Sequence, residues 1–353
     1  MAKNGFEGER AGIVNKEELL SLRLRNQFLS VPCQGFLELA RSLCGLQAQY
    51  FNNVLYSIMI RCGPQAVKDW DTKLIKTWTI RGTLHAIPQD DLPIYTALTE
   101  NSAYITKYGI DTKLLHDVAA EIMTHLAGAA CGRPELKAHF RDKIADEELL
   151  DRLFSGWGGI FTLLAAQGKI VFESVKSRKF RAVSHKVPWE KPAAVKVLVK
   201  RYFQHYGPAT VADAVKFFGI KKTEILAVLK GWSDLCDVSV ADKTYYYLKY
   251  PGAAPDIPKI TYLTGFDPLL IGYRDRGVIL PEEHKRSIIT ATGVIKPALM
   301  IDGRICGQWS IKAGKMQITL FERQPKNVQR ELMEAGEKIF GRNFSQLGIL
   351  FRL

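Results

Sequence analysis

Residues 193–248, AAVKVLVKRYFQHYGPATVADAVKFFGIKKTEILAVLKGWSDLCDVSVADKTYYYL, hold the clearest structural pattern of this chain. Apolar residues at helical spacing predict three helices, over residues 193–206, 211–218 and 222–229. Glycine and proline interrupt the pattern between the helices, and Thr210 stands where it can cap the second one. A predicted hairpin follows, with strands over 238–240 and 245–248. Three helices followed by a two-stranded wing are typical of a winged-helix module with a helix-turn-helix at its centre.

Two upstream regions repeat this organisation without repeating its residues. The nearer region has predicted helices over 116–126, 134–140 and 146–167, and predicted strands over 169–173 and 180–184. The first region has a helix capped by Asn15, a helix over 36–47, a third helix that ends near Trp78 and a strand over 83–88. The pattern therefore predicts three tandem winged-helix modules.

Downstream of Pro251, Pro255 and Pro258 the pattern changes from helices to strands. Predicted strands lie over 260–263, 287–291, 298–301, 304–306 and 316–320, followed by a helix over 327–340. Asp302-Gly303 between two apolar runs indicates a hairpin. We expect an α+β protein with modules at 1–108, 109–190 and 191–258, the last including the linker, and a β-rich domain at 259–353.

Composition supports a globular protein. Of the 353 residues, 47% are hydrophobic and 24% are charged, and no apolar run is long enough to cross a membrane. The first residues, MAKNGFEGERAG, lack the apolar core of a secretion signal. Six cysteines lie far apart without a CxxC pair, so we expect reduced thiols, no zinc site and a cytoplasmic location.

Positive charge is concentrated in one stretch. The net charge is +13, and residues 169–201 hold ten Lys or Arg against two Glu. A surplus of this size indicates a polyanionic partner, most often nucleic acid. The alternative is a basic face that only keeps the protein soluble; clustering favours a binding stripe.

No phosphate-binding loop, HExxH or GxSxG motif is present, but Gln47-Ala48-Gln49 is a candidate site. Two residues two apart point to opposite sides of a regular helix, so the glutamines converge only at a helix end or a distortion. Each amide offers one acceptor and two donors, and a pair of amides can hold and polarise a water molecule without adding charge. The alternative is two solvated glutamines on a helix.

Two further segments carry candidate contacts. Trp78 to His85, with Arg81-Gly82 between them, suits a tight turn beside a nucleic-acid backbone, or a packed Trp with an ion-paired Arg. Residues 266–276 bring an apolar segment, Asp267-Pro-Leu-Leu270, up to Arg274-Asp-Arg276. That loop either clamps phosphate or forms an ion-paired surface turn.

These three blocks, in this order and at similar distances, resemble those of a bacterial superfamily, the winged-helix DNA glycosylases of the AlkZ and YcaQ type, over nearly the full chain. Gln47-Ala48-Gln49 is similar to the Gln-Φ-Gln signature of the AlkZ branch, with Ala48 a small residue for Φ. The resemblance implies three tandem winged helices and a C-terminal β-barrel-like domain, arranged as a C-shaped cradle. It also implies a monofunctional glycosylase that acts on N7-alkylated purines and unhooks interstrand crosslinks.

The implied chemistry needs no cofactor and no metal, because a cationic alkylated base leaves easily and the enzyme has mainly to position water. The expected partner is double-stranded DNA with alkylated or crosslinked purines, bound by a monomer associated with the nucleoid. Gln47 and Gln49 are the expected catalytic residues, and the expected DNA contacts are Trp78, Arg81, His85, Lys176, Arg178, Lys179, Arg274, Arg276 and Arg304.

Arg304 follows the turn of a hairpin that could enter the minor groove opposite the lesion, a role that the loop 274–276 could fill instead. An ordinary exposed hairpin is the alternative. Two alternative functions to a DNA glycosylase are a winged-helix regulator without catalysis and an RNA-processing partner.

Overall fold

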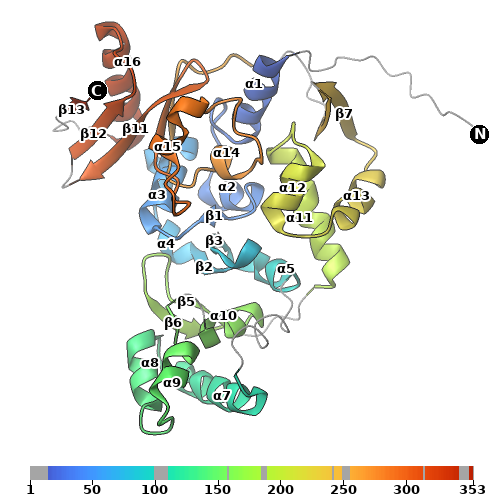
Figure 1. Ribbon diagram of the computed structural model, residues 1–353, viewed down its shortest axis with the longest axis vertical. Helices are drawn as coiled ribbons and strands as arrows, with labels where there is room; N and C mark the ends of the chain where they lie inside the picture. The colour runs from blue at the N-terminus through green and yellow to red at the C-terminus, as the bar shows by residue number, and fades with distance from the viewer. Residues whose placement is uncertain are drawn as a thin grey trace, which may run out of the picture.

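A computed structural model describes residues 15–98, 110–156, 159–183, 189–240, 242–248, 255–312, 315–341 and 350–352. It is a mixed α/β structure in which three small sheets and one larger sheet lie among helices (Figure 1). None of the described helices is both long and apolar enough to cross a membrane. The N-terminal residues 1–14, Ser184 of a predicted strand and Pro251 of the predicted linker lie outside the described residues.

The first segment follows α1 (Lys16–Asn26), which Asn15 caps by accepting from the backbone N–H groups of Glu17 and Glu18. Its strands pair antiparallel in the order β1-β3-β2. The elements are α2 (Phe36–Ser42), β1 (Leu46–Gln47), α3 (Phe51–Cys62), η1 (Pro64–Val67), α4 (Trp70–Lys73), β2 (Leu74–Trp78), η2 (Ile80–Gly82), β3 (Leu84–Pro88), η3 (Gln89–Asp91) and α5 (Leu92–Thr96).

The second segment has the same strand order, β4-β6-β5. Its elements are α7 (Thr112–Gly128), β4 (Cys131–Gly132), α8 (Arg133–Phe140), α9 (Glu147–Leu153), α10 (Gly159–Ala166), β5 (Ile170–Phe172) and β6 (Lys179–Ala182). Most of its apolar side chains form a core of their own, against which Trp78 and Leu84 of the first segment pack. In both segments a helix leads into a first strand, further helices follow, and the last strand of the segment lies between the other two.

The third segment repeats this order in reduced form. Its elements are α11 (Lys191–His205), α12 (Val211–Phe218), α13 (Lys222–Lys230), β7 (Leu235–Val240) and β8 (Lys243–Leu248). Ala209 forms an isolated bridge to Tyr246 of β8 and so takes the place of the first strand. Thr210 caps α12 in a capping box with Asp213, as the sequence predicts.

The C-terminal part is an open five-stranded sheet in the order β13-β12-β11-β10-β9. Only β12 and β13 are parallel. The elements are β9 (Ile260–Leu263), α14 (Pro268–Ile271), η4 (Glu282–His284), α15 (Lys285–Ile288), β10 (Ala298–Ile301), β11 (Arg304–Lys312), β12 (Lys315–Leu320), α16 (Lys326–Phe340) and β13 (Leu350–Arg352). The expected barrel-like closure is wrong, because β9 and β13 remain the two edges of the described sheet. Apolar side chains of α3 and α16 share a core with this sheet, so helices rather than closing strands cover it.

Four predicted elements differ from the structure. The single helix predicted over 146–167 is divided into α9 and α10. The helix predicted over 36–47 ends at Ser42, because Cys44 and Gly45 adopt φ angles of 55° and 92° that a right-handed helix does not allow. The segment before Trp78, predicted as a helix end, is strand β2. The strand predicted over 287–291 is replaced by α15 and a single bridge from Ile289.

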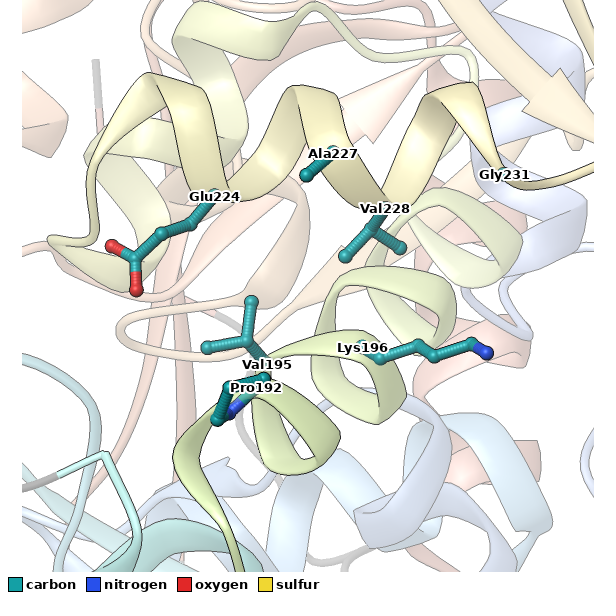
Figure 2. A pocket seen from close by; sticks show the side chains of 7 residues that line it. All are labelled: Pro192, Val195, Lys196, Glu224, Ala227, Val228 and Gly231. Atoms are coloured by element: carbon teal, nitrogen blue, oxygen red, sulfur yellow. The ribbon is translucent and has the colours of Figure 1, made fainter.

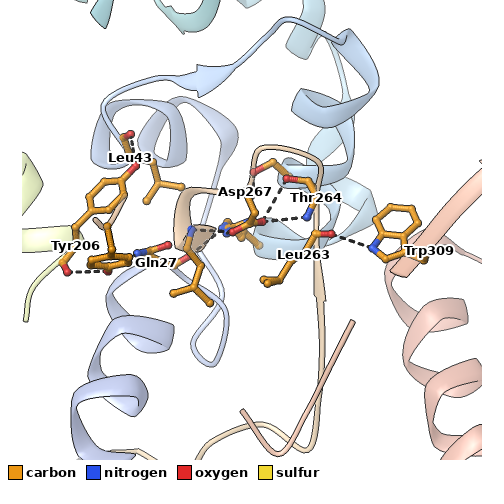
Figure 3. Close-up of polar contacts among 11 residues, drawn as sticks. Gln27, Leu43, Tyr206, Leu263, Thr264, Asp267 and Trp309 are labelled. Carbon is orange, nitrogen blue, oxygen red and sulfur yellow. Dashed lines mark hydrogen bonds and ion pairs between the residues drawn. The ribbon is translucent and has the colours of Figure 1, made fainter. Parts of the chain in front are cut away.

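A buried polar network joins the C-terminal part and the third segment to the first (Figure 3). Arg61 of α3 pairs with Asp267 at 2.8 Å, and both side chains are fully buried. Asp267 also caps α14 through the backbone N–H of Leu269, and the Tyr206 hydroxyl donates to the Leu43 carbonyl at 2.9 Å. Asp267 is therefore a structural residue of the segment 266–276, and it joins that segment to α3 of the first segment.

Candidate functional site

The glutamine pair does not lie on a helix: Gln47 ends strand β1, and Gln49 lies in the bend between β1 and α3. Leu46 and Ala48 are each 2% exposed, whereas Gln47 is half-buried and Gln49 is exposed. This alternation is that of an extended chain, in which residues two apart point to the same side. Leu46 and Ala48 thus point into the core, and the two glutamines point away from the side that they occupy.

Gln47 lies at one end of a row of polar residues that crosses the first sheet. It lies opposite His85 of β3, and His85 lies opposite Thr77 of β2. The side-chain oxygens Oε1 of Gln47 and Oγ1 of Thr77 are both buried without a hydrogen-bond partner. Because buried polar atoms are nearly always paired in native proteins, an unpaired acceptor at this place indicates a ligand or water site.

His85 is the centre of that row. Its side chain is inside the protein, with an exposed fraction of 2%, and Nδ1 lies 2.8 Å from Oγ1 of Thr79. Burial, helped by the charge of Arg81, lowers the pKa of His85 to about 4, so the imidazole is neutral near pH 7. A Cβ at Gly45 would lie 3.1 Å from the His85 Cβ, which explains a glycine at that position. His85 was expected to contact DNA, but its burial places it behind the glutamines.

Exposed aromatic side chains adjoin the glutamines. Tyr50 is 52% exposed and Phe51 is 42% exposed, directly after Gln49. The Tyr50 ring stacks on Phe266 of the 266–276 segment, with centroids 6.3 Å apart and planes 22° apart. No role was predicted for these rings. The sequence shows two aromatic residues next to a polar motif, but only the structure shows that they are exposed and not part of the core.

Trp78 and Arg81 contact other segments of the protein. The Trp78 ring lies 5.3 Å from Phe172 and 6.1 Å from Phe180, in the core of the second segment. The Arg81 guanidinium donates to the Phe217 carbonyl and lies 5.4 Å above the Phe217 ring of α12. Of the two alternatives raised for Trp78, the packed one fits the structure, and both residues fix neighbouring segments to the first sheet.

The predicted basic wing folds back on the first segment, and Figure 1 shows the loop between β5 and β6 reaching α4. Lys176 pairs with Asp71 at 2.9 Å and lies 5.5 Å from the Trp70 ring. Lys176, Arg178 and Lys179 are all exposed. Lys176 combines its exposed side chain with an ion pair to the first segment.

Lys76 holds the loop between β5 and β6 in place through hydrogen bonds. Its ammonium donates to the carbonyls of Val175 and Ser177 at 2.8 and 2.6 Å. Burial, followed by the charge of Arg178, lowers the pKa of Lys76 to about 8. In the strand register Lys76 lies opposite Ala86, one position from His85, so its side chain leaves the sheet on the face away from Gln47.

The loop 274–276 and the Asp302-Gly303 hairpin are both held against the protein. Arg276 donates to the Leu270 carbonyl at 2.6 Å, whereas the Arg274 side chain is exposed along a groove of about 870 Å³ between α12, α13 and β8. A Cβ at Gly303 would come within 2.7 Å of Leu20 in α1, so the hairpin tip packs there. Arg304, next to that tip, is exposed.

A separate cavity of about 330 Å³ lies between α11 and α13 (Figure 2). Val195 and Val228 face each other across it, with Lys196 and Glu224 toward its ends. Neither glutamine lines this cavity, and its Glu224 carboxylate already accepts from the backbone N–H of Lys221 and pairs with Lys191.

Comparisons with known proteins identify the family of this chain. The model of the AlkZ-like DNA glycosylase family matches residues 40–340, and this chain belongs to that family. It is therefore an enzyme, a DNA glycosylase that hydrolyses N-glycosyl bonds, consistent with a monofunctional type. The resemblance inferred from the three sequence blocks is confirmed at this level.

One protein sequence and one solved structure from Streptomyces sahachiroi are similar to the chain. An interstrand DNA cross-link repair glycosylase is 28% identical over 355 residues, which cover 89% of this chain and 94% of that protein. The solved structure of the DNA glycosylase AlkZ matches with a TM-score of 0.76 and 24% identity, covering 95% of this chain and 98% of that one. At this identity the structural match shows the shared fold.

Proposed function

We propose that this chain is a DNA repair enzyme that releases N7-alkylated purines from duplex DNA and unhooks interstrand crosslinks, by means of water held between Gln47 and Gln49. The unpaired, buried Oε1 of Gln47, two residues before the exposed Gln49, is the observation that carries the proposal. The similarity to a cross-link repair glycosylase supports the choice of substrate.

The amides suit the chemistry of a cationic leaving group. An N7-alkylated purine already carries positive charge, so breaking its bond to the sugar needs no strong general acid. Positive charge instead develops on the sugar, where a fixed amide oxygen stabilises it and orients the attacking water. The neutral His85 behind Gln47 adds no charge that would repel that cation.

Lys76 supports a monofunctional enzyme. A bifunctional glycosylase needs an amine nucleophile at the sugar, and a lysine with a lowered pKa is the natural candidate. Lys76 has such a pKa, yet it projects from the opposite face of the sheet to Gln47 and donates to two carbonyls. It is a structural lysine in this proposal, and strand cleavage does not follow base release.

The exposed rings of Tyr50 and Phe51 supply a surface on which a base can stack. Stacking on aromatic side chains is independent of sequence, because every base has a π face. The rings lie beside the glutamines in the chain, so they hold the nucleotides around the lesion while the amides act on the sugar. Phe266 supports Tyr50 from behind.

The three segments of shared strand order are winged-helix modules in this proposal, bounded at 1–108, 109–190 and 191–258, and with residues 259–353 they form a C-shaped cradle around the duplex. The protein acts as a cytoplasmic, nucleoid-associated monomer without a cofactor. In this proposal the phosphates are contacted by Arg178, Lys179, Arg274 and Arg304, all of which are exposed.

The test is base release from duplexes that contain N7-methylguanine or a purine crosslink. Wild-type protein is expected to release the base without cutting the strand, and borohydride is expected to trap no covalent complex. A Gln47→Ala/Gln49→Ala double variant is expected to bind the duplex and to release no base above background. Binding by wild-type protein without any release would instead favour a winged-helix regulator.

A further inference from the structure

Three potential metal ligands meet on the surface of the second segment, far in sequence from the glutamines. Glu121 and His125 lie one turn apart on α7, and His139 lies near the end of α8. One ligand atom from each residue lies within 4.8 Å of the other two. Residues four apart on a helix share a face, so α7 presents a carboxylate and an imidazole together toward α8.

The contacts show that this place attracts a cation. Nε2 of His139 lies 2.5 Å from Oε1 of Glu121, and the rings of His125 and His139 are 4.0 Å apart in an edge-on arrangement. The ammonium of Lys143 contacts the same Glu121 oxygen and lies 3.3 Å from Nε2 of His139. A positive group already occupies the position between carboxylate and imidazole.

Two imidazole nitrogens and one carboxylate oxygen form a donor set that zinc favours, with a fourth position left for water. We propose that Glu121, His125 and His139 bind a zinc ion, which displaces the Lys143 ammonium. Ligands at 2.0–2.2 Å from tetrahedral zinc stand about 3.4 Å apart. The side chains of Glu121 and His139 are each 32% exposed, so rotation about their bonds can bring the three atoms to that spacing without moving the core.

The bound ion would join α7 to α8 across the outer face of the second segment, where exposed ion pairs now hold the helices. The cysteine spacing in the sequence argued against a zinc site built from thiolates. That argument does not apply to this cluster, because none of its three ligands is a cysteine. The inference is independent of base release, since none of its residues belongs to the proposed glycosylase site. Binding releases the Lys143 ammonium to solvent.

The experiment titrates ZnCl₂ into the metal-free full-length protein against a chromophoric chelator. One equivalent is expected to bind, and His125→Ala or His139→Ala is expected to weaken binding by at least about 10–100-fold, the cost of losing even a supporting group. His116→Ala, an exposed histidine on the same helix, is the matched control and should bind as wild type does. Lys143→Ala should bind more tightly, because the competing ammonium is gone.

A second measurement separates this site from the cysteines. Cobalt bound to imidazole and carboxylate gives no thiolate charge-transfer band, and zinc should raise the melting temperature of wild-type protein and of His116→Ala but not of His125→Ala. Retention of the equivalent by the His125→Ala/His139→Ala double variant would overturn the proposal. So would a thiolate band, unchanged affinity in Lys143→Ala, or no binding by wild-type protein.

Discussion

The first and second segments have the same strand order but differ in the hydrogen bonding of the polar atoms on their strands. In the first, Gln47 lies opposite His85, and buried oxygens of Gln47 and Thr77 have no partner. In the second, the equivalent strand holds Cys131 and Gly132, whose thiol and backbone N–H both donate to Glu135.

The remainder of the second sheet is lined by stacked rings, with Phe161 and Phe180 only 4.3 Å apart. The two sheets thus differ in the side chains that line them. In the second segment the unpaired buried atoms, Nε of Arg133 and Oε1 of Gln167, lie outside the strands. In the first segment the unpaired oxygens of Gln47 and Thr77 lie on the strands themselves, where a substrate could form hydrogen bonds to them. A shared topology therefore does not determine activity, which depends on particular side chains placed on it.

The largest expected effect contrasts the ion pairs of the two segments. Asp267→Asn leaves the fully buried Arg61 charge without its partner and should lower the free energy of unfolding by about 3–5 kcal/mol. Asp151→Asn, which removes the exposed pair with Lys137 in the second segment, should cost no more than about 1 kcal/mol. Denaturant titration of both variants measures the difference, and equal costs would show that the first segment is not anchored through Arg61.

Single substitutions test the contrast between the first strands of the two sheets. Gln47→Ala and Gln49→Ala should each slow base release by about 10–1000-fold, because each removes one oriented polar group at the transition state. Cys131→Ala on the equivalent strand should leave the rate unchanged. Single-turnover rates, with DNA affinity as the control, make the comparison; wild-type rates in both glutamine variants would refute the water-positioning mechanism.

The pH dependence of stability should reveal the buried His85. Its folded pKa of about 4 lies below the ordinary value of 6.5, so the unfolded chain binds a proton first as the pH falls. The folded state therefore loses stability below pH 6.5, by roughly 2 kcal/mol between pH 7 and 5. Unfolding curves should show this loss in the wild type and a smaller loss in His85→Asn. A parallel decline in both proteins would contradict it.

The smallest effect concerns the tip of the second segment. Arg178→Ala and Lys179→Ala should each reduce the slope of log affinity against log salt by about 0.9 if the residue contacts a phosphate. Lys176→Ala should leave the slope unchanged, because Asp71 already neutralises that ammonium. An equal change in all three variants would mean that the loop leaves α4 when DNA binds.

Local structure followed closely from the sequence. The third segment, the strands Ile260–Leu263 and Ala298–Ile301 and the last helix were all predicted within a few residues, because their apolar periodicity and turn residues agree. The errors fell where tertiary pairing overrode local preference. Leu74–Trp78 is a strand because it pairs with β3, and the C-terminal sheet stays open because α3 and α16 already cover it.

The sequence by itself determined the module pattern, the excess of basic residues and the identity of the glutamine motif, since each of these is a property of neighbouring residues. Only the tertiary structure decided that Gln47 is on a strand, because that required the chain to leave α2 at Cys44-Gly45 and pair with β3. It also decided which of the predicted contact residues interact with other parts of the protein. His85, Arg81 and Lys176 are engaged by residues that folding brings to them, and the free energy of an ion pair or a buried side chain depends on such neighbours.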